Sequence, residues 1–136
     1  MPSSSRIYRC PKCHAALNPE HAVVLLASFG PTRVLVGLHP EPGNYEVHLP
    51  PQVDVQPGTQ WTFACPVCRA DLRSQIDDKL CAVELLEGTT IHELLFSRVA
   101  GEKVTFVVRD RTVHRWFGQH ADEYVPHLVN MKYTLL

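Results

Sequence analysis

Short apolar runs separated by turn residues cover most of the chain, and this pattern is typical of β-strands. Four such runs lie in the first half, at residues 22–29, 34–36, 45–49 and 61–65. Turn residues such as Gly30-Pro31 and Pro57-Gly58 separate them. The first half therefore predicts a β-meander rather than a long loop.

Four further strand-like runs follow in the second half, at residues 80–86, 91–99, 104–109 and 112–117. The segments between them contain glycine or adjacent polar residues, which suit hairpin turns. A helix over residues 91–99, capped by Thr90, is the alternative for the second run. The strand is favoured because residues 99–104 read as a hairpin.

The C-terminal part of the chain changes its pattern. Ala121, Tyr124, Val125 and Leu128 recur at helical spacing and predict a short helix, which Pro126 kinks or restarts. Residues 131–136 form an apolar, alternating tail. This tail either pairs with the protein's own sheet or is covered by another molecule.

Four of the five cysteines form two matching motifs, Cys10-Pro-Lys-Cys13 and Cys65-Pro-Val-Cys68. Each tight turn aims two thiols at one ion, and two such turns supply the tetrahedral sulfur shell of a structural zinc. The proline fixes φ directly after the first cysteine of each motif. We therefore expect Cys10, Cys13, Cys65 and Cys68 to hold one structural Zn²⁺.

His14 and Arg69 follow the two motifs at positions where glycine is common, because the backbone there tends toward positive φ. Histidine tolerates this region better than arginine, so the second turn is expected to be the less regular one. His14 is also a candidate to orient or replace a sulfur ligand. Cys81 lies in an apolar run and is expected to be a buried thiol, and the alternative is a spare ligand or a reactive thiol.

Other readings of the cysteines are weaker. Residues 10–14 match the attachment motif of a c-type haem, but this leaves Cys65 and Cys68 without a role. A redox pair needs a βαβ setting that neither motif has. Disulfides are disfavoured because the polar start of the chain lacks an export signal, so we expect a cytoplasmic protein.

Size and charge limit the possible functions. The chain has 136 residues, 45% of them hydrophobic, and a formal net charge of −1. One modest core or two small lobes fit this length, and no apolar run is long enough to cross a membrane. A protein that binds mainly to phosphates usually carries a basic excess, which this chain lacks.

Catalytic patterns were not found in the sequence, so we expect neither catalytic residues nor an organic cofactor. His92-Glu93 begins like a zinc-protease helix, but Phe96 stands where the second histidine is required. One cluster of basic residues lies among aromatic ones in the later strands and could stack bases and hold phosphates. Its basic members are Arg98, Lys103, Arg109, Arg111 and Arg115.

The two Cys-Pro-x-Cys motifs, each expected beside a hairpin, resemble the zinc-ribbon superfamily. This resemblance covers the first half of the chain and implies one structural zinc gripped by two knuckles. It implies no activity, because ribbons serve nucleic-acid binding, protein docking and scaffolding. In size and layout the chain also resembles the small zinc-binding subunits of acetophenone-carboxylase-type enzymes, which implies a larger complex.

Together these observations predict a mostly β protein of the small α+β kind. Residues 1–75 are expected to form a zinc ribbon with an inserted β-meander, and residues 76–136 a small antiparallel sheet with a C-terminal helix and an apolar tail. The expected function is that of a non-catalytic protein-interaction module, an accessory subunit that binds larger protein subunits. A nucleic-acid-binding ribbon is the alternative.

Overall fold

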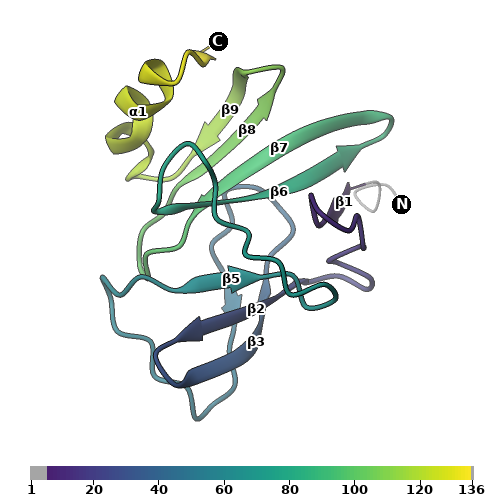
Figure 1. The fold of residues 1–136 in the computed structure, drawn as a ribbon, viewed down its shortest axis with the longest axis vertical. Coiled ribbons are helices and arrows are strands. Elements are labelled where there is room, and N and C mark those ends of the chain that lie inside the picture. Colours follow the sequence, from purple (N-terminus) through teal and green to yellow (C-terminus); the bar gives the residue numbers. More distant parts are fainter. Residues whose placement is uncertain (1–5, 136) are drawn as a thin grey trace.

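The computed structural model describes residues 6–135, which form two β-sheets and a short helical segment (Figure 1). The large sheet contains β1 (Arg6–Arg9), β6 (Leu80–Glu87), β7 (Thr90–Ser97), β8 (Thr105–Arg109), β9 (Thr112–Phe117) and β10 (Thr134–Leu135). The small sheet contains β2 (Val23–Phe29), β3 (Thr32–Leu38), β4 (Val47–His48) and β5 (Thr62–Ala64). The prediction of a mostly β fold with two sheets is confirmed.

The large sheet has the strand order β1-β6-β7-β8-β9-β10. Strands β6 to β9 form successive antiparallel hairpins, as the turn residues between them predict. The run at residues 91–99 is a strand, so the helical alternative is wrong. The turn between β8 and β9 has positive φ at both Asp110 and Arg111, as expected for a two-residue hairpin loop.

The small sheet has the order β4-β3-β2-β5. Strands β2 and β3 form a hairpin in which Leu26 lies opposite Leu35. Strand β4 adds to β3, and β5 then returns to the other side of β2, where Ala64 lies opposite Leu26. Prolines at 50, 51 and 57 lie in the connection between β4 and β5, where they cannot donate to a sheet ladder.

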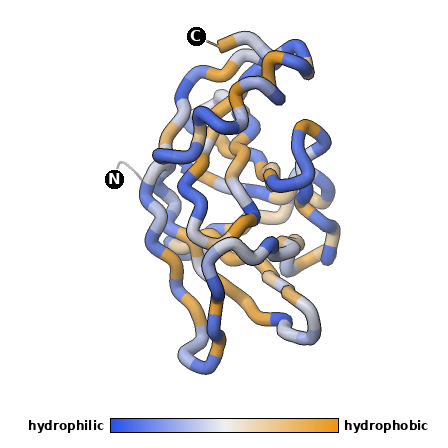
Figure 2. The backbone as a smooth tube through the Cα atoms, turned by 90° about the vertical axis from the view of Figure 1, so that its left-hand side faces the viewer, coloured by the Kyte–Doolittle hydropathy of each residue, from blue (hydrophilic) through white to orange (hydrophobic). Residues whose placement is uncertain are grey.

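Neighbouring residues of β7 point into two different cores. Leu94 belongs to the core between the two sheets, and Leu95 belongs to the core beneath the helical segment. Strand geometry explains this division, because successive side chains point to opposite faces. The alternation of hydrophobic and hydrophilic residues is visible along the strands in Figure 2. The large sheet is therefore covered on both faces.

The helical segment covers the face of the large sheet that lies away from the small sheet. It starts as the 3-10 turn η2 (Ala121–Tyr124) and continues as α1 (Val125–Asn130), with Pro126 in the first turn of the helix. Leu128 of this segment is fully buried in the second core. The expected C-terminal helix is confirmed, and of the two expected effects of Pro126 the structure shows a restart, with the proline in the first turn of α1.

The C-terminal tail pairs with the protein's own sheet. Strand β10 runs parallel to β9, with Thr134 opposite Thr112. Tyr133 and Leu135 pack against the second core. Of the two expectations for this tail, pairing with its own sheet is the one found for residues 134 and 135. Residue 136 lies outside the described residues.

Strand pairing also crosses the expected boundary between residues 75 and 76. Strand β1 belongs to the first half of the sequence, but it pairs with β6 of the second half, so that Tyr8 lies opposite Leu85. Tyr8 and Leu85 both belong to the core between the sheets. The two halves of the sequence therefore share one core. Within residues 6–135, neither helical element has the length and apolar character needed to cross a membrane.

Candidate metal centre

The two cysteine motifs fold into matching turns. In each turn the amide of the first cysteine donates a hydrogen bond to a carbonyl five residues later. These bonds join Cys10 to Ala15 and Cys65 to Ala70, and both have a length of 3.0 Å. The amides of His14 and Arg69 donate back to the carbonyl of the first cysteine in their own turn, each at 2.9 Å. The same local sequence, Cys-Pro-x-Cys, therefore produces the same local fold twice.

The positions after the turns adopt the predicted positive φ. His14 has φ 64° and Arg69 has φ 68°, so both side chains occupy the left-handed region that glycine usually fills. The arginine turn has the same hydrogen bonds as the histidine turn. The expectation that the second turn is less regular is therefore wrong, because the same two backbone hydrogen bonds fix the conformation of both turns.

Each turn extends from a different sheet. Strand β1 of the large sheet ends at Arg9, directly before Cys10, and β5 of the small sheet ends at Ala64, directly before Cys65. The chain pairs briefly across each turn, Arg9 with Ala16 and Ala64 with Asp71. The site therefore lies where the two sheets meet.

The four sulfur atoms of Cys10, Cys13, Cys65 and Cys68 lie within 4.8 Å of one another. The Sγ atoms of Cys10 and Cys68 are 3.8 Å apart, and so are those of Cys13 and Cys65. These separations exceed the roughly 2.05 Å of a disulfide bond. They suit four thiolates around one ion, so the four predicted cysteines are positioned to bind a metal ion.

Amide groups prepare two of these sulfurs for negative charge. Cys10 Sγ accepts from the amides of Lys12 and Cys13, at 3.3 and 3.5 Å, and Cys65 Sγ accepts from those of Val67 and Cys68, at 3.3 and 3.4 Å. Cys10 and Cys65 are both fully buried. Burial raises the pKa of Cys65, but the amides and the neighbouring thiols outweigh it and lower the pKa to about 7. The protein thus stabilises a thiolate there.

Neither His14 nor Cys81 belongs to the group of four cysteines. His14 is exposed, and its Nδ1 lies 3.4 Å from a carboxylate oxygen of Glu84. Glu84 also accepts from Arg9 Nε at 2.6 Å, so it connects the first turn to β6. Cys81 is fully buried among apolar side chains, and burial raises the pKa of its thiol to about 12. The prediction of a buried Cys81 is confirmed.

Sequence reasoning missed the contacts of Glu84. Arg9 and Glu84 lie directly opposite each other in the β1–β6 ladder, but their sequence positions are far apart. Opposite charges on facing strands would be a signal only if the strand pairing were already known.

The basic residues of the later strands lie in different surroundings. Arg98 is only 8% exposed, and its guanidinium donates to the carbonyl of Trp61. Arg111 lies over the ring of Tyr133, 4.4 Å from its centre. Arg115 pairs with Glu87 at 2.6 Å, while Lys103 and Arg109 are exposed. They do not offer a row of free cations, and the nucleic-acid alternative stays a prediction.

Comparisons with known proteins found no match to a family model, to a curated protein or to a solved structure. The fold and the site therefore define the class of protein by themselves. This class is a small two-sheet β protein with a metal site of four cysteines, built from one turn of each sheet.

A second group of titratable residues surrounds His92 on the inner face of the large sheet. His92 is 9% exposed, and its Nδ1 has no hydrogen-bond partner among the described residues. Its Nε2 lies 3.4 Å from Glu87. Burial lowers the pKa of His92, and Arg115, Arg109 and His114 lower it further, whereas Glu87 raises it. We infer that His92 is neutral in the folded protein at neutral pH.

This environment predicts a loss of stability on mild acidification. The folded protein binds fewer protons at His92 than the unfolded chain does. The contribution of His92 to the free energy of unfolding is therefore complete above the ordinary pKa of about 6.5, and it declines as the pH falls below that value. We expect His92→Gln to flatten the fall in the urea midpoint between pH about 8 and about 5.5. Metal content is checked at each pH, because thiolate protonation also releases metal. Equal slopes for both proteins at constant metal content would contradict the prediction.

Proposed function

We propose that the site holds one structural zinc ion. Tetrahedral zinc with Zn–S bonds of about 2.3 Å places its sulfurs about 3.8 Å apart. Two of the sulfur pairs, Cys10–Cys68 and Cys13–Cys65, are 3.8 Å apart, and all four sulfurs lie within 4.8 Å of one another. The residues present therefore fit zinc, which would be held by Cys10, Cys13, Cys65 and Cys68 and would supply a rigid cross-link. Elemental analysis of the purified protein, expected to give one zinc and no iron per chain, tests this assignment.

The position of the site supports a structural role. Strand β1 presents Cys10 from the large sheet, and β5 presents Cys65 from the small sheet. One ion on these turns joins the two sheets, and this juxtaposition is the observation that carries the proposal. Four sulfurs complete a structural zinc shell, whereas a catalytic zinc keeps an open position. In this proposal the protein is therefore not itself an enzyme.

We further propose that the protein acts as an interaction module, an accessory subunit bound to a larger protein. The supporting feature is an apolar patch on the outer face of the small sheet, formed by Val24, Leu26, Leu35 and Ala64. Leu35, Leu26 and Ala64 lie side by side across β3, β2 and β5. Leu35 is 55% exposed. Val24, Leu26 and Ala64 are partly exposed, and an apolar row that reaches the surface in this way often marks a contact with another protein.

A charge in the middle of this patch is expected to weaken complex formation strongly. Leu35→Glu changes an exposed position, so the fold should be retained while an apolar contact is lost, which weakens binding by at least about tenfold. Ile91→Glu is the matched control, because Ile91 is also exposed, at 49%, but lies on the large sheet. The measurement is co-purification from the host, followed by reconstitution of the complex from the purified partner.

The outcomes separate the interaction module from its alternative. A stoichiometric complex that forms with the wild type and Ile91→Glu, fails with Leu35→Glu and resists added salt supports the module. Binding that falls steeply with salt and follows nucleic acid supports the ribbon that binds phosphates. A complex that forms equally well with both variants would place the contact elsewhere and overturn the assignment of the patch.

A further inference from the structure

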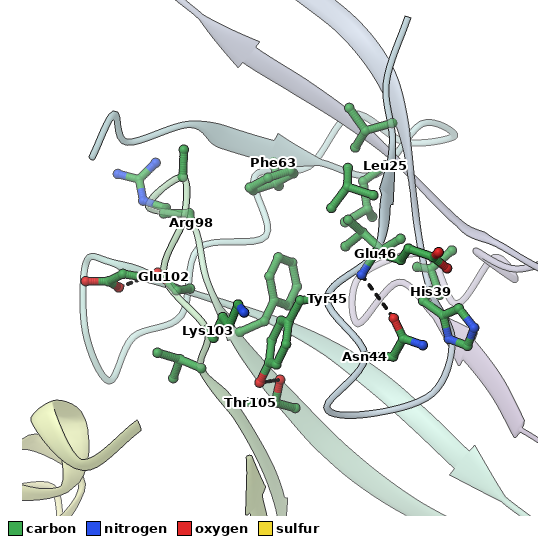
Figure 3. Close-up of a pocket in the computed structure, with 18 of the residues that line it drawn as sticks. Leu25, His39, Asn44, Tyr45, Glu46, Phe63, Arg98, Glu102, Lys103 and Thr105 are labelled. Atoms are coloured by element: carbon green, nitrogen blue, oxygen red, sulfur yellow. Dashed lines mark hydrogen bonds between the residues drawn. The ribbon is translucent and has the colours of Figure 1, made fainter. Parts of the chain in front are cut away.

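A pocket of about 320 Å³ opens between the inner faces of the two sheets (Figure 3). Leu25 and Val36 contribute its wall from the small sheet, and Leu94 and Phe96 contribute the wall from β7. Phe63 of β5 also lines it, so the wall combines aliphatic and aromatic side chains. The lining is predominantly apolar, as expected of a pocket for a small molecule.

Several of the polar groups that line the pocket are already bonded to other protein groups. The hydroxyls of Tyr45 and Thr105 are hydrogen-bonded to each other over 2.9 Å. Glu102 Oε1 accepts from the hydroxyls of Ser97 and Tyr124, both at 2.6 Å. A ligand would therefore find few polar atoms inside that still need a partner.

The hydrogen bonds of Arg98, which also lines the pocket, lead to the same conclusion. Arg98 Nε donates to the carbonyl of Asp78 at 2.7 Å, and Arg98 Nη1 donates to the carbonyl of Trp61 at 3.0 Å. Among residues 6–135, the buried side-chain atom without a partner is Nδ1 of His92, which does not line the pocket. Because a buried polar ligand group needs its own partner, these walls favour a ligand without one.

Charged side chains stand at the mouth of the pocket. Glu41, Glu46 and Lys103 line it and are exposed, so water screens their charges. They carry both signs and do not form a site of one charge. The mouth therefore provides no strong attraction for an anion or a cation.

Size and lining together indicate the class of ligand. We propose that the pocket binds a small, uncharged apolar molecule, about as large as a compound with two fused aromatic rings. Its volume is about twice that of the 150 Å³ apolar cavity that accommodates one benzene. Tyr45, Trp61, Phe63 and Phe96 offer ring faces and edges for such a ligand. This site lies on the inner face of the small sheet and is separate from the outer patch.

The test uses the neutral fluorophore N-phenyl-1-naphthylamine and the zinc-loaded full chain. We expect saturable binding of one probe per chain. Val36→Phe fills the pocket and should weaken binding by at least about tenfold. Leu35→Phe is the matched control, because it places the same ring on the next residue of β3 but on the outer face, and it should leave affinity unchanged. Naphthalene-2-sulfonate should compete at least about tenfold less well than naphthalene.

Each other result overturns the proposal. Absence of saturable binding to the wild type excludes the site, and equal affinities of wild type and Val36→Phe place the probe elsewhere. If Leu35→Phe weakened probe binding and Val36→Phe did not, the probe would bind on the outer patch. Stronger competition by the sulfonate would show that the ligand is an anion. If Val36→Phe does not fold, Leu38→Phe is tested in its place, because Leu38 also lines the pocket and is partly exposed. The same loss of probe affinity is expected.

Discussion

Cys65→Ser is expected to abolish zinc binding and to unfold the protein at room temperature. Cys65 Sγ is fully buried and receives two amide hydrogen bonds, so serine cannot replace it as a soft ligand without loss. Structural zinc contributes about 10–16 kcal/mol of apparent binding free energy in small finger peptides. A domain of this kind is stable by only about 5–15 kcal/mol. Loss of the ion therefore removes an amount comparable with the entire stability.

Metal analysis and thermal unfolding followed by circular dichroism check this expectation. Cys81→Ala provides the matched control, because it removes another fully buried thiol that lies outside the four-cysteine group. It should retain one zinc per chain and cost only about 1 kcal/mol for the small cavity. Chelation of the wild type should reproduce the effect of Cys65→Ser. A Cys65→Ser protein that keeps both its metal and its melting temperature would refute the structural role of the site.

The hydrogen bonds of the site explain why the four clustered cysteines could be predicted from the sequence. A Cys-Pro-x-Cys motif determines its own turn, because its hydrogen bonds run between residues no more than five apart. The hairpins of β6 to β9 were predictable for a similar reason, since alternation and turn residues are local signals. Both expectations follow from short-range interactions, and both agree with the structure.

Features that depend on contacts between remote segments could not be predicted. Residues 6–9 are too short to show a pattern, and their partner β6 lies far along the chain. The pocket and the outer patch exist only because one face of the small sheet packs on the large sheet while the other does not. The surroundings of Arg98 were also missed, because a charged residue near a strand end reads as exposed.

Arg98→Met is expected to have the second largest effect on stability. Arg98 is 8% exposed at the end of the large sheet, next to the last residue of β7. Its guanidinium donates to the carbonyl of Trp61 at 3.0 Å and its Nε to the carbonyl of Asp78 at 2.7 Å. Trp61 directly precedes β5, so this side chain is a second link between the sheets. Methionine preserves the length of the side chain but leaves both carbonyls without a donor.

We expect Arg98→Met to lower the free energy of unfolding by about 1–3 kcal/mol, the cost of one buried polar group without a partner, because the hydrogen bond to Trp61 is buried whereas Asp78 is an exposed residue whose carbonyl water can reach. The urea midpoint of the zinc-saturated protein measures this change. Arg109→Met removes an exposed arginine and should stay within about 0.5 kcal/mol of the wild type. Asp78→Asn gives an upper bound for the Arg98 ion pair, because it removes a 64% exposed carboxylate that lies 3.6 Å from Arg98 and 3.0 Å from Arg73.

These three variants decide which contact of Arg98 matters. If the carbonyl hydrogen bonds dominate, Asp78→Asn costs no more than about 1 kcal/mol, as expected of an exposed ion pair. If the charge pair dominated instead, Asp78→Asn and Arg98→Met would be equally destabilising. A midpoint for Arg98→Met that equals that of Arg109→Met would show that the guanidinium does not join the sheets, and the zinc ion would then be their main cross-link.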